Sequence, residues 1–264
     1  TVIDVATTVQ YLKCRYYVNN QNFKVSNQKI IFDSFILNDE QDNYAELIGL
    51  LDLSDLNKIY TELMVFTPKF QFLNTKKKDN NYFYGDAFAD GSLYIEGYLD
   101  DISFDITATS LPGTQIYLPL EYDYAEGEDQ FYTFVNTTID STVTKKENYE
   151  IDLSKFKFSG IFDITDDAEI QIIFDQQAGD IIRSRGNGEI FMDVNEFGEF
   201  SMLGNYNITE GDYLFTFQNI INKKFKVAPG GTISWSGDPL NAQIDINAIY
   251  EKRVSPYPLI QGLG

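Results

Sequence analysis

The side chains that carry out most enzyme chemistry are scarce in this chain. It holds 40 acidic and 20 basic residues but no histidine, and Cys14 is its only cysteine. Serine–histidine and cysteine–histidine nucleophile pairs, histidine-ligated zinc and an intramolecular disulfide are therefore excluded. A carboxylate pair of the glycoside hydrolase kind remains chemically possible. Because the acidic residues lie mostly in turn segments or alternate with apolar residues, we expect solvated faces, no catalysis, no metal and no cofactor.

Three short motifs could be taken for phosphate or calcium sites, but each lacks a necessary part. Neither Gly230-Gly231 nor Gly237-Asp238-Pro239 is followed by the Lys-Ser/Thr pair and the helix that a phosphate-binding loop requires. The acidic residues 123–129 lack the Asp-x-Asp-x-Asp-Gly spacing of a calcium loop. We interpret the first two motifs as turns and the third as a solvated loop.

The apolar residues, in contrast, follow a clear pattern of period two. Between Gly204 and Tyr250, side chains such as Tyr213, Phe215 and Phe217 alternate with residues of the opposite face. The same spacing returns in the final stripe, which consists of Ala242, Ile244, Ile246, Ala248 and Tyr250. Successive side chains of a strand point to opposite faces, so this segment is predicted to form strands with one apolar face and one wet face.

Composition places limits on the class of protein and on its partners. With 264 residues, 43% of them hydrophobic and 15% aromatic, the chain suits half-buried pleated surfaces rather than disorder. The net charge is -20 and the only compact basic run is Lys76-Lys77-Lys78, so nucleic acid is excluded as a partner. No stretch approaches the roughly twenty apolar residues that a membrane-spanning helix needs.

Strand patterns recur along the whole chain and indicate one elongated unit covering residues 1–264. Turns are predicted at Asn38-Asp39, Asp90-Gly91, Pro112-Gly113, Asn187-Gly188 and Gly230-Gly231. Repeated short strands are typical of a propeller, a sandwich or a solenoid-like sheet, and we interpret the chain as a segment of a longer polypeptide. The strands are predicted at residues 29–37, 44–51, 59–66, 92–99, 102–110, 115–120, 149–153, 156–163, 168–175, 188–194 and 199–208, followed by the closing set described above.

Particular motifs in the closing set identify a family. They are Gly211-Asp212-Tyr213-x-Phe215-Thr216, Asn222-Lys223-Lys224-Phe225, Gly230-Gly231-x-Ile233-x-Trp235-x-Gly237-Asp238-Pro239 and Ala242-x-Ile244-x-Ile246-x-Ala248-x-Tyr250. Together they resemble the C-terminal domain of the TamB family (translocation and assembly module), which belongs to the AsmA-like group of bacterial envelope proteins. The resemblance is most specific over residues 168–250, weaker over residues 30–120 and absent from residues 1–20.

This resemblance implies an all-β fold, an elongated and twisted sheet curled into an open, taco-like apolar groove. It further implies a protein that spans the periplasm and bridges the inner and outer membranes, with an N-terminal inner-membrane anchor outside this segment. The C-terminal end would be associated with the outer membrane, at a TamA-like β-barrel or a lipoprotein variant of it. Family members are implicated in phospholipid transport between the membranes and were first linked to assembly of outer-membrane proteins.

The apolar stripes supply candidate residues for the lining of such a groove. Alternation alone is equally typical of a closed core, and a slip of one residue in register would exchange the two faces. The resemblance favours the groove. Its predicted lining consists of Leu93, Ile95, Phe104, Ile106, Ile170, Ile172, Phe174, Ile190, Met192, Val194, Phe200, Met202, Tyr213, Phe215, Phe217, Ile233, Trp235, Ile244 and Ile246.

Three functions are compatible with these observations. The leading hypothesis is a lipid-transfer segment whose apolar groove shields phospholipid acyl chains. The second is a scaffold for outer-membrane protein assembly that acts through exposed strand edges. The third is a carbohydrate-active or carbohydrate-binding β-solenoid, which would place aromatic residues and paired carboxylates on its outer face.

Overall fold

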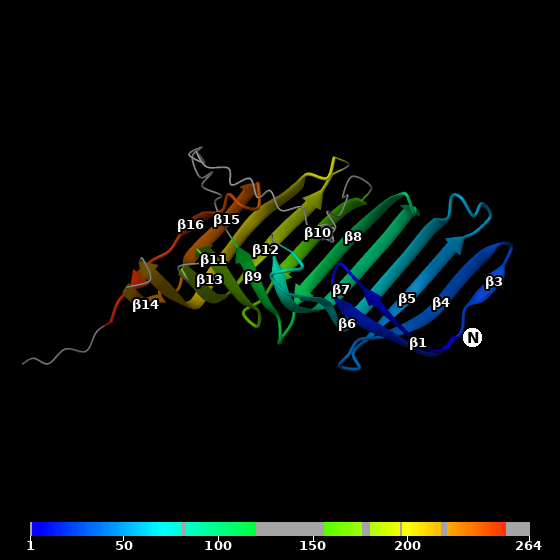
Figure 1. Cartoon of the computed structure of the whole chain (residues 1–264), viewed down its shortest axis with the longest axis horizontal. Coiled ribbons are helices and arrows are strands. Elements are labelled where there is room, and N and C mark those ends of the chain that lie inside the picture. The colour runs from blue at the N-terminus through cyan, green and yellow to red at the C-terminus, as the bar shows by residue number, and fades with distance from the viewer. Residues whose placement is uncertain are drawn as a thin grey trace, which may run out of the picture.

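The computed structural model describes residues 2–80, 83–119, 156–175, 180–195, 197–217 and 221–251. For Ile3, Phe156, Asp175, Phe217, Ile221 and Asn222 it describes the backbone alone. The described residues form one sheet of 17 strands and contain no helix. Figure 1 shows an elongated, twisted sheet with β1 to β5 at one end and β14 at the other. The predicted all-β fold, an elongated curled sheet, is thus confirmed.

Most strands form where the sequence alternates, and several are longer than the alternation alone predicts. The predicted strand at residues 149–153 and the acidic loop at residues 123–129 lie outside the described residues. The strands are β1 (Val2–Val9), β2 (Cys14–Gln21), β3 (Lys24–Ser26), β4 (Lys29–Asn38), β5 (Tyr44–Asp52), β6 (Tyr60–Thr75), β7 (Tyr84–Tyr98), β8 (Asp101–Ser110), β9 (Gln115–Pro119), β10 (Phe156–Ile164), β11 (Glu169–Asp175), β12 (Asp180–Val194), β13 (Phe200–Phe217), β14 (Ile221–Val227), β15 (Gly231–Gly237), β16 (Gln243–Asp245) and β17 (Ala248–Ile249).

Sequential strands pair as antiparallel neighbours along most of the sheet. β4 to β8 form a meander, and the long strands β12 and β13 form a hairpin. The exceptions lie at the centre, where β10 runs parallel to β8 and β11 runs parallel to β9. These two parallel ladders join the N-terminal and C-terminal halves into one continuous sheet.

One line of breaks runs across the sheet, and we call it the bend line. Three long strands change partner at this line. Along one edge, β7 pairs with β8 on one side of the line and with β9 on the other, and β12 pairs in the same way with β10 and β11. β13 pairs with β15 on one side and with β14 on the other. Each such pair is therefore one strand interrupted at the bend line. The breaks lie at residues 67–70 of β6, at 111–114 and 165–168 between strands, at 185–186 of β12, and at 228–230 and 246–247 between strands.

The bend line divides the sheet into two arms, each a row of neighbouring strands. The long arm contains β4, β5, β8, β10, β15 and β16 with one half of β6, β7, β12 and β13. The short arm contains β9, β11, β14 and β17 with the other half of those four strands. The β1–β2 hairpin extends the short arm beside β6, where the Tyr16 hydroxyl donates to the Gln71 carbonyl at 3.1 Å.

Threonine and serine side chains satisfy the backbone where the ladders break. Thr114 Oγ1 accepts from the Phe88 N–H at 3.1 Å and lies 3.0 Å from the Phe88 carbonyl oxygen, to which it donates. At the neighbouring break, just after β10, the Thr165 N–H donates to Ser110 Oγ at 2.9 Å, and Thr165 Oγ1 donates to the Ser110 carbonyl. Because an unpaired buried backbone group is costly, these bonds allow the sheet to bend at this line.

Two predicted turns, Asp90-Gly91 and Asn187-Gly188, are wrong, because both dipeptides lie inside long strands, β7 and β12. A Cβ atom on Gly91 would overlap the carbonyl oxygen of Thr107 on β8, and one on Gly188 would overlap that of Asn205 on β13. At these positions glycine permits a close approach of neighbouring strands rather than a reversal of the chain. The turns at Pro112-Gly113 and Gly230-Gly231 are confirmed, and both lie at the bend line.

Candidate functional site

Strand register places most apolar stripes of the sequence on one face of the sheet. Residues opposite each other in a ladder share a face, so the pairings can be followed from strand to strand. Leu93 pairs with Ile106 and Ile95 with Phe104 across β7 and β8. The ladders continue this face through β10 to β12 and β13. We call it the inner face, because it lies on the inner side of the bend.

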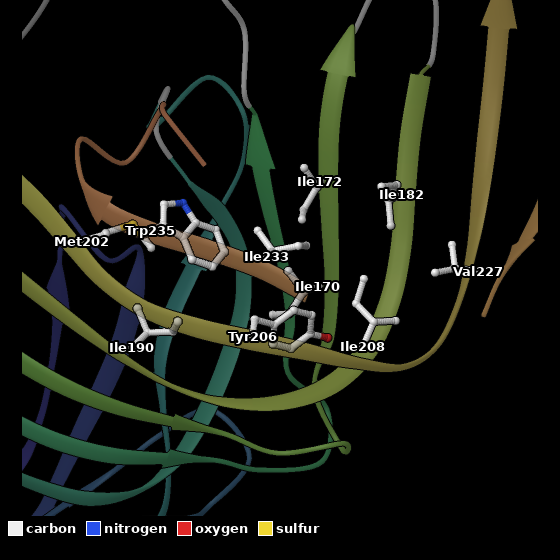
Figure 2. Close-up of a cluster of buried hydrophobic side chains, with 10 residues drawn as sticks. All are labelled: Ile170, Ile172, Ile182, Ile190, Met202, Tyr206, Ile208, Val227, Ile233 and Trp235. Atoms are coloured by element: carbon white, nitrogen blue, oxygen red, sulfur yellow. The ribbon is translucent and has the colours of Figure 1, made fainter. Parts of the chain in front are cut away.

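At the bend line the inner face is closed by side chains from both arms. Figure 2 shows these side chains gathered inside the curve of the strands. Ile172 and Ile182 come from the short arm and Ile233 from the long arm, and none of the three has any exposed surface. The complete cluster is Ile170, Ile172, Ile182, Ile190, Met202, Tyr206, Ile208, Val227, Ile233 and Trp235. This part of the inner face is ordinary hydrophobic core.

Tyr206 is the largest side chain in this cluster that is almost completely buried, with 2% of its surface exposed. Its hydroxyl lies 3.4 Å from Ser184 Oγ, which also donates to the Ile170 carbonyl oxygen. The hydroxyl therefore crosses the bend line, from β13 in the long arm to β12 in the short arm. Burial raises the pKa of Tyr206 to about 12, so the side chain is neutral at physiological pH.

Away from the bend line the inner face remains apolar but is only half-buried. On the long arm, Ile95, Phe104 and Val194 are all of intermediate exposure. On the short arm, Phe174 and Tyr213 are likewise half-buried, with ring centroids 6.2 Å apart. The arms are therefore sealed where they meet, while apolar surface stays accessible further out.

Most predicted lining residues lie on this inner face. Six of them are in the buried cluster: Ile170, Ile172, Ile190, Met202, Ile233 and Trp235. Six are partly buried and packed against it: Phe174, Met192, Phe200, Tyr213, Ile244 and Ile246. Six more are half-buried on the inner face: Leu93, Ile95, Phe104, Ile106, Val194 and Phe215. Phe217 belongs to β13, but its side chain is outside the described part.

Several inner-face residues are absent from the predicted lining. Tyr206 and Ile208 continue the alternating stripe that begins at Phe200 and Met202, so the sequence contained a signal for both. Ile182 lies outside the strand predicted at residues 188–194, because β12 begins at Asp180. On β6, Leu63 and Val65 pair with Ile95 and Leu93, and only the strand register identifies them.

The outer face carries more exposed apolar side chains than expected for a sheet with one apolar and one solvated face. Phe66, Phe191 and Leu203 are 42%, 42% and 50% exposed on it. A shallow depression of about 300 Å³ lies on this face, between Phe66 and Ile161. Of the predicted lining, only Leu93 and Ile106 border this depression.

Metal and nucleophile chemistry finds little support in the described part of the chain. Within it, no three His, Cys, Asp or Glu side chains gather so as to hold a metal ion. Burial raises the pKa of the Cys14 thiol to about 11, so it stays protonated at neutral pH. Over the same residues, no helix has the length and hydropathy to cross a membrane.

Comparison with known proteins identifies the family. The family model for the TamB C-terminal domain matches residues 33–257, which is most of the chain. No curated protein and no solved structure gives a significant match. The matched region includes every strand from β5 to β17 and the second half of β4, from Asp33 to Asn38, hence both arms and the bend line. The chain therefore belongs to the TamB family of bacterial envelope proteins, through its C-terminal domain.

Proposed function

We propose that this domain transfers phospholipid between the membranes of the bacterial envelope, with acyl chains held against its inner face. The observation that carries the proposal is the half-buried apolar surface on both arms, beyond the sealed bend line. In a closed sandwich, residues such as Ile95 and Phe104 would be covered by a second layer of the same protein. Here they keep part of their surface accessible.

The energetics suit a sliding ligand better than a fixed one. Removing an acyl chain from water gains about 0.8 kcal/mol per methylene, so a tail of roughly fifteen methylenes needs on the order of 10 kcal/mol of shielding. The long arm has ten strands in its row, from β4 to β16. At about 4.8 Å per strand this row is about 43 Å long. Neighbouring positions along it are similar in chemistry, so a tail can move without a large barrier.

The remaining parts of the proposal are supported by the family relationship. They are a periplasmic location bridging the two membranes, an inner-membrane anchor outside these residues, and docking of the C-terminal end to a TamA-like outer-membrane barrel or its lipoprotein variant. No catalytic activity belongs to this account, because shielding and sliding of an acyl chain require no bond to be made or broken.

A second candidate function, scaffolding of outer-membrane proteins through strand edges, is favoured by the C-terminal end of the sheet. β17 pairs with only Lys226 and Val227 of β14, and β16 pairs with three residues of β15. Among the described residues, the ladder registers pair β16 with β15 and β17 with β14, and the other edge of each has no ladder. Such an edge can accept a strand from another chain.

Lipid analysis of the purified chain tests the lipid-transfer proposal. The chain would be produced in bacteria, purified without added lipid, extracted and examined by mass spectrometry. A variant carrying Ile95→Asp and Phe104→Asp places two charges on the inner face of the long arm. The matched control carries Phe191→Asp and Leu203→Asp, at exposed positions on the outer face.

We expect phospholipid on the parent and on the outer-face control, and at least a tenfold loss on the inner-face variant, with β-sheet circular dichroism retained by all three. If the inner-face variant does not fold, the milder Phe104→Gln replaces it. A folded parent without lipid would contradict the proposal and favour the scaffold function. Equal lipid on both variants would place the lipid elsewhere on the molecule.

A further inference from the structure

The inner face carries almost no charge, and the exceptions lie close together. Register from β4 to β17 assigns inner-face positions that are otherwise apolar, glycine or hydroxyl-bearing, apart from Asp175, which pairs with Asp180 and of which only the backbone is described. Among those whose side chains the structure describes, the two charged residues are Asp180 on β12 and Lys223 on β14. Both lie at one place on the short arm.

The two residues lie on either side of Phe215. Lys223 is directly opposite Phe215 in the β13–β14 ladder. Asp180 lies one residue beyond the pair Ile181–Leu214, and so beside Phe215 on the other flank. With neighbouring strands about 4.8 Å apart, the backbones of Asp180 and Lys223 are about 10 Å apart. A negative and a positive group therefore face the same space, at the end of the short arm farthest from the bend line.

Aromatic rings form an apolar floor between this pair and the core. The Phe225 ring lies 6.0 Å from Tyr213, 6.5 Å from Phe215 and 5.4 Å from Tyr250, measured between centroids. The Lys223 ammonium is 5.1 Å from the centroid of Tyr250. The Asp180 carboxylate interacts with the Tyr213 hydroxyl, and burial together with this contact raises the pKa of Tyr213 to about 12. Both charges are thereby held at the margin of an apolar surface.

This arrangement matches the chemistry of a zwitterionic phospholipid. An acyl chain on the aromatic floor places its headgroup at the outer end of the short arm, because the headgroup keeps its water. Ethanolamine headgroups carry a phosphate anion and, two carbons away, an ammonium cation. Lys223 attracts the phosphate and Asp180 attracts the ammonium. A headgroup that has the phosphate but no ammonium gains the first contact and is repelled by the carboxylate.

We propose that Asp180 and Lys223, with the aromatic floor between them, form a binding site for a phosphate ester that carries an ammonium group, as in phosphatidylethanolamine. This site rests on the proposed lipid-transfer function and adds a headgroup preference to it. It also sets an exit or entry position on the inner face, close to the C-terminal end of the sheet.

Competition between two lipids tests the site. The 264-residue chain would be incubated with vesicles of equimolar phosphatidylethanolamine and phosphatidylglycerol, separated from them, and its bound lipids quantified by mass spectrometry. The test variants are Asp180→Asn and Lys223→Gln. Asp212→Asn and Lys224→Gln are matched controls, because these residues lie close by on β13 and β14 but pair with each other on the outer face at 2.7 Å.

We expect the parent to enrich phosphatidylethanolamine, and Asp180→Asn to shift the lipid ratio toward phosphatidylglycerol by about two- to fivefold, the size of an exposed charge contact. Lys223→Gln should reduce total bound lipid by a similar factor, while both controls match the parent. Glycerophosphoethanolamine without acyl chains should compete weakly, since it lacks the apolar anchor; strong competition by it would overturn the acyl-chain part of the site.

Two contrary results are distinguishable. Unchanged lipid ratio and amount in Asp180→Asn and Lys223→Gln would overturn the headgroup site while the apolar inner face still holds lipid. No lipid on a parent that shows the β-sheet circular dichroism spectrum would overturn both the lipid-transfer function and the headgroup site that rests on it.

Discussion

Tyr206 shows how one residue can hold the two arms together. Its ring lies in the cluster at the bend line, and its hydroxyl reaches Ser184 on the other arm. Asp39 has a comparable role at the N-terminal end of the sheet. Its carboxylate accepts from the N–H groups of Gln41, Asn43 and Gln71, tying the β4–β5 turn to β6. Both side chains are almost completely buried; Asp39 binds backbone N–H groups directly, whereas Tyr206 contacts the side chain of Ser184.

Stability at alkaline pH should depend on Tyr206. Its pKa is raised to about 12 by burial, against about 10 in an unfolded chain. Between these values the folded state keeps a proton that the unfolded state loses, so the free energy of unfolding falls as pH rises from about 10 to 12. The loss from this residue is about 2–3 kcal/mol, and the contribution is fully present below pH 10.

Urea unfolding at several pH values from 8 to 11.5 measures this effect. Tyr206→Phe should be less stable than the parent at pH 8, because the cross-arm contact with Ser184 is lost, and its stability should fall less steeply above pH 10. Tyr44→Phe, at a half-exposed outer position, is the control and should keep the slope of the parent. Equal slopes for Tyr206→Phe and the parent would show that Tyr206 is not the group responsible.

At the scale of elements, the decisive feature is that several strands are interrupted at one line without leaving the sheet. β8 and β9 follow the same neighbour, β7, on either side of residues 111–114. β10 and β11 follow β12 in the same way on either side of residues 165–168. The two interruptions are linked, since the Glu169 N–H donates to the Thr114 carbonyl at 3.0 Å. The sheet therefore bends as a unit rather than strand by strand.

Thr114 should be necessary for the bend line at β7. Thr114→Val keeps the size and the branched Cβ but removes both hydrogen bonds to Phe88. The buried Phe88 N–H then has lost its acceptor, Thr114 Oγ1. We expect a loss of about 1–3 kcal/mol in the free energy of unfolding, measured by urea denaturation. Thr107→Val, on the exposed outer face of β8, should change it by less than about 0.5 kcal/mol. Equal effects of the two substitutions would refute a special role for Thr114.

The period-two pattern predicted which residues share a face but not where the sheet bends. Alternation identifies Ile95 and Phe104 as neighbours on an apolar face because that depends only on strand geometry. Alternation does not show which of these residues is sealed, like Ile172 in the cluster at the bend line, and which is half-exposed. That line is set by hydrogen bonds between distant residues such as Ser110 and Thr165. The dipeptide Asp90-Gly91 resembles a turn in the local sequence. Its glycine is instead required by the close approach of β8, a contact between strands that the local sequence does not show.

Over the whole molecule, the fold combines a buried core at the bend line with two arms whose apolar inner face is partly accessible. Side chains from both arms pack into one buried cluster at the bend line. Each strand contacts chiefly its neighbours, as in a solenoid, so the apolar surface can continue from one end of the sheet to the other. A net charge of -20 favours solubility through repulsion between molecules.

The most direct test of this account is site-specific photo-crosslinking to phospholipid. A benzophenone amino acid would replace Phe104 on the inner face or Phe191 on the outer face, both aromatic positions in long-arm strands. After illumination with phospholipid vesicles, intact mass spectrometry detects a lipid adduct. We predict adducts at position 104 and none above background at position 191. Adducts at position 191 alone, or at neither position in folded protein, would contradict the central claim that acyl chains lie on the inner face.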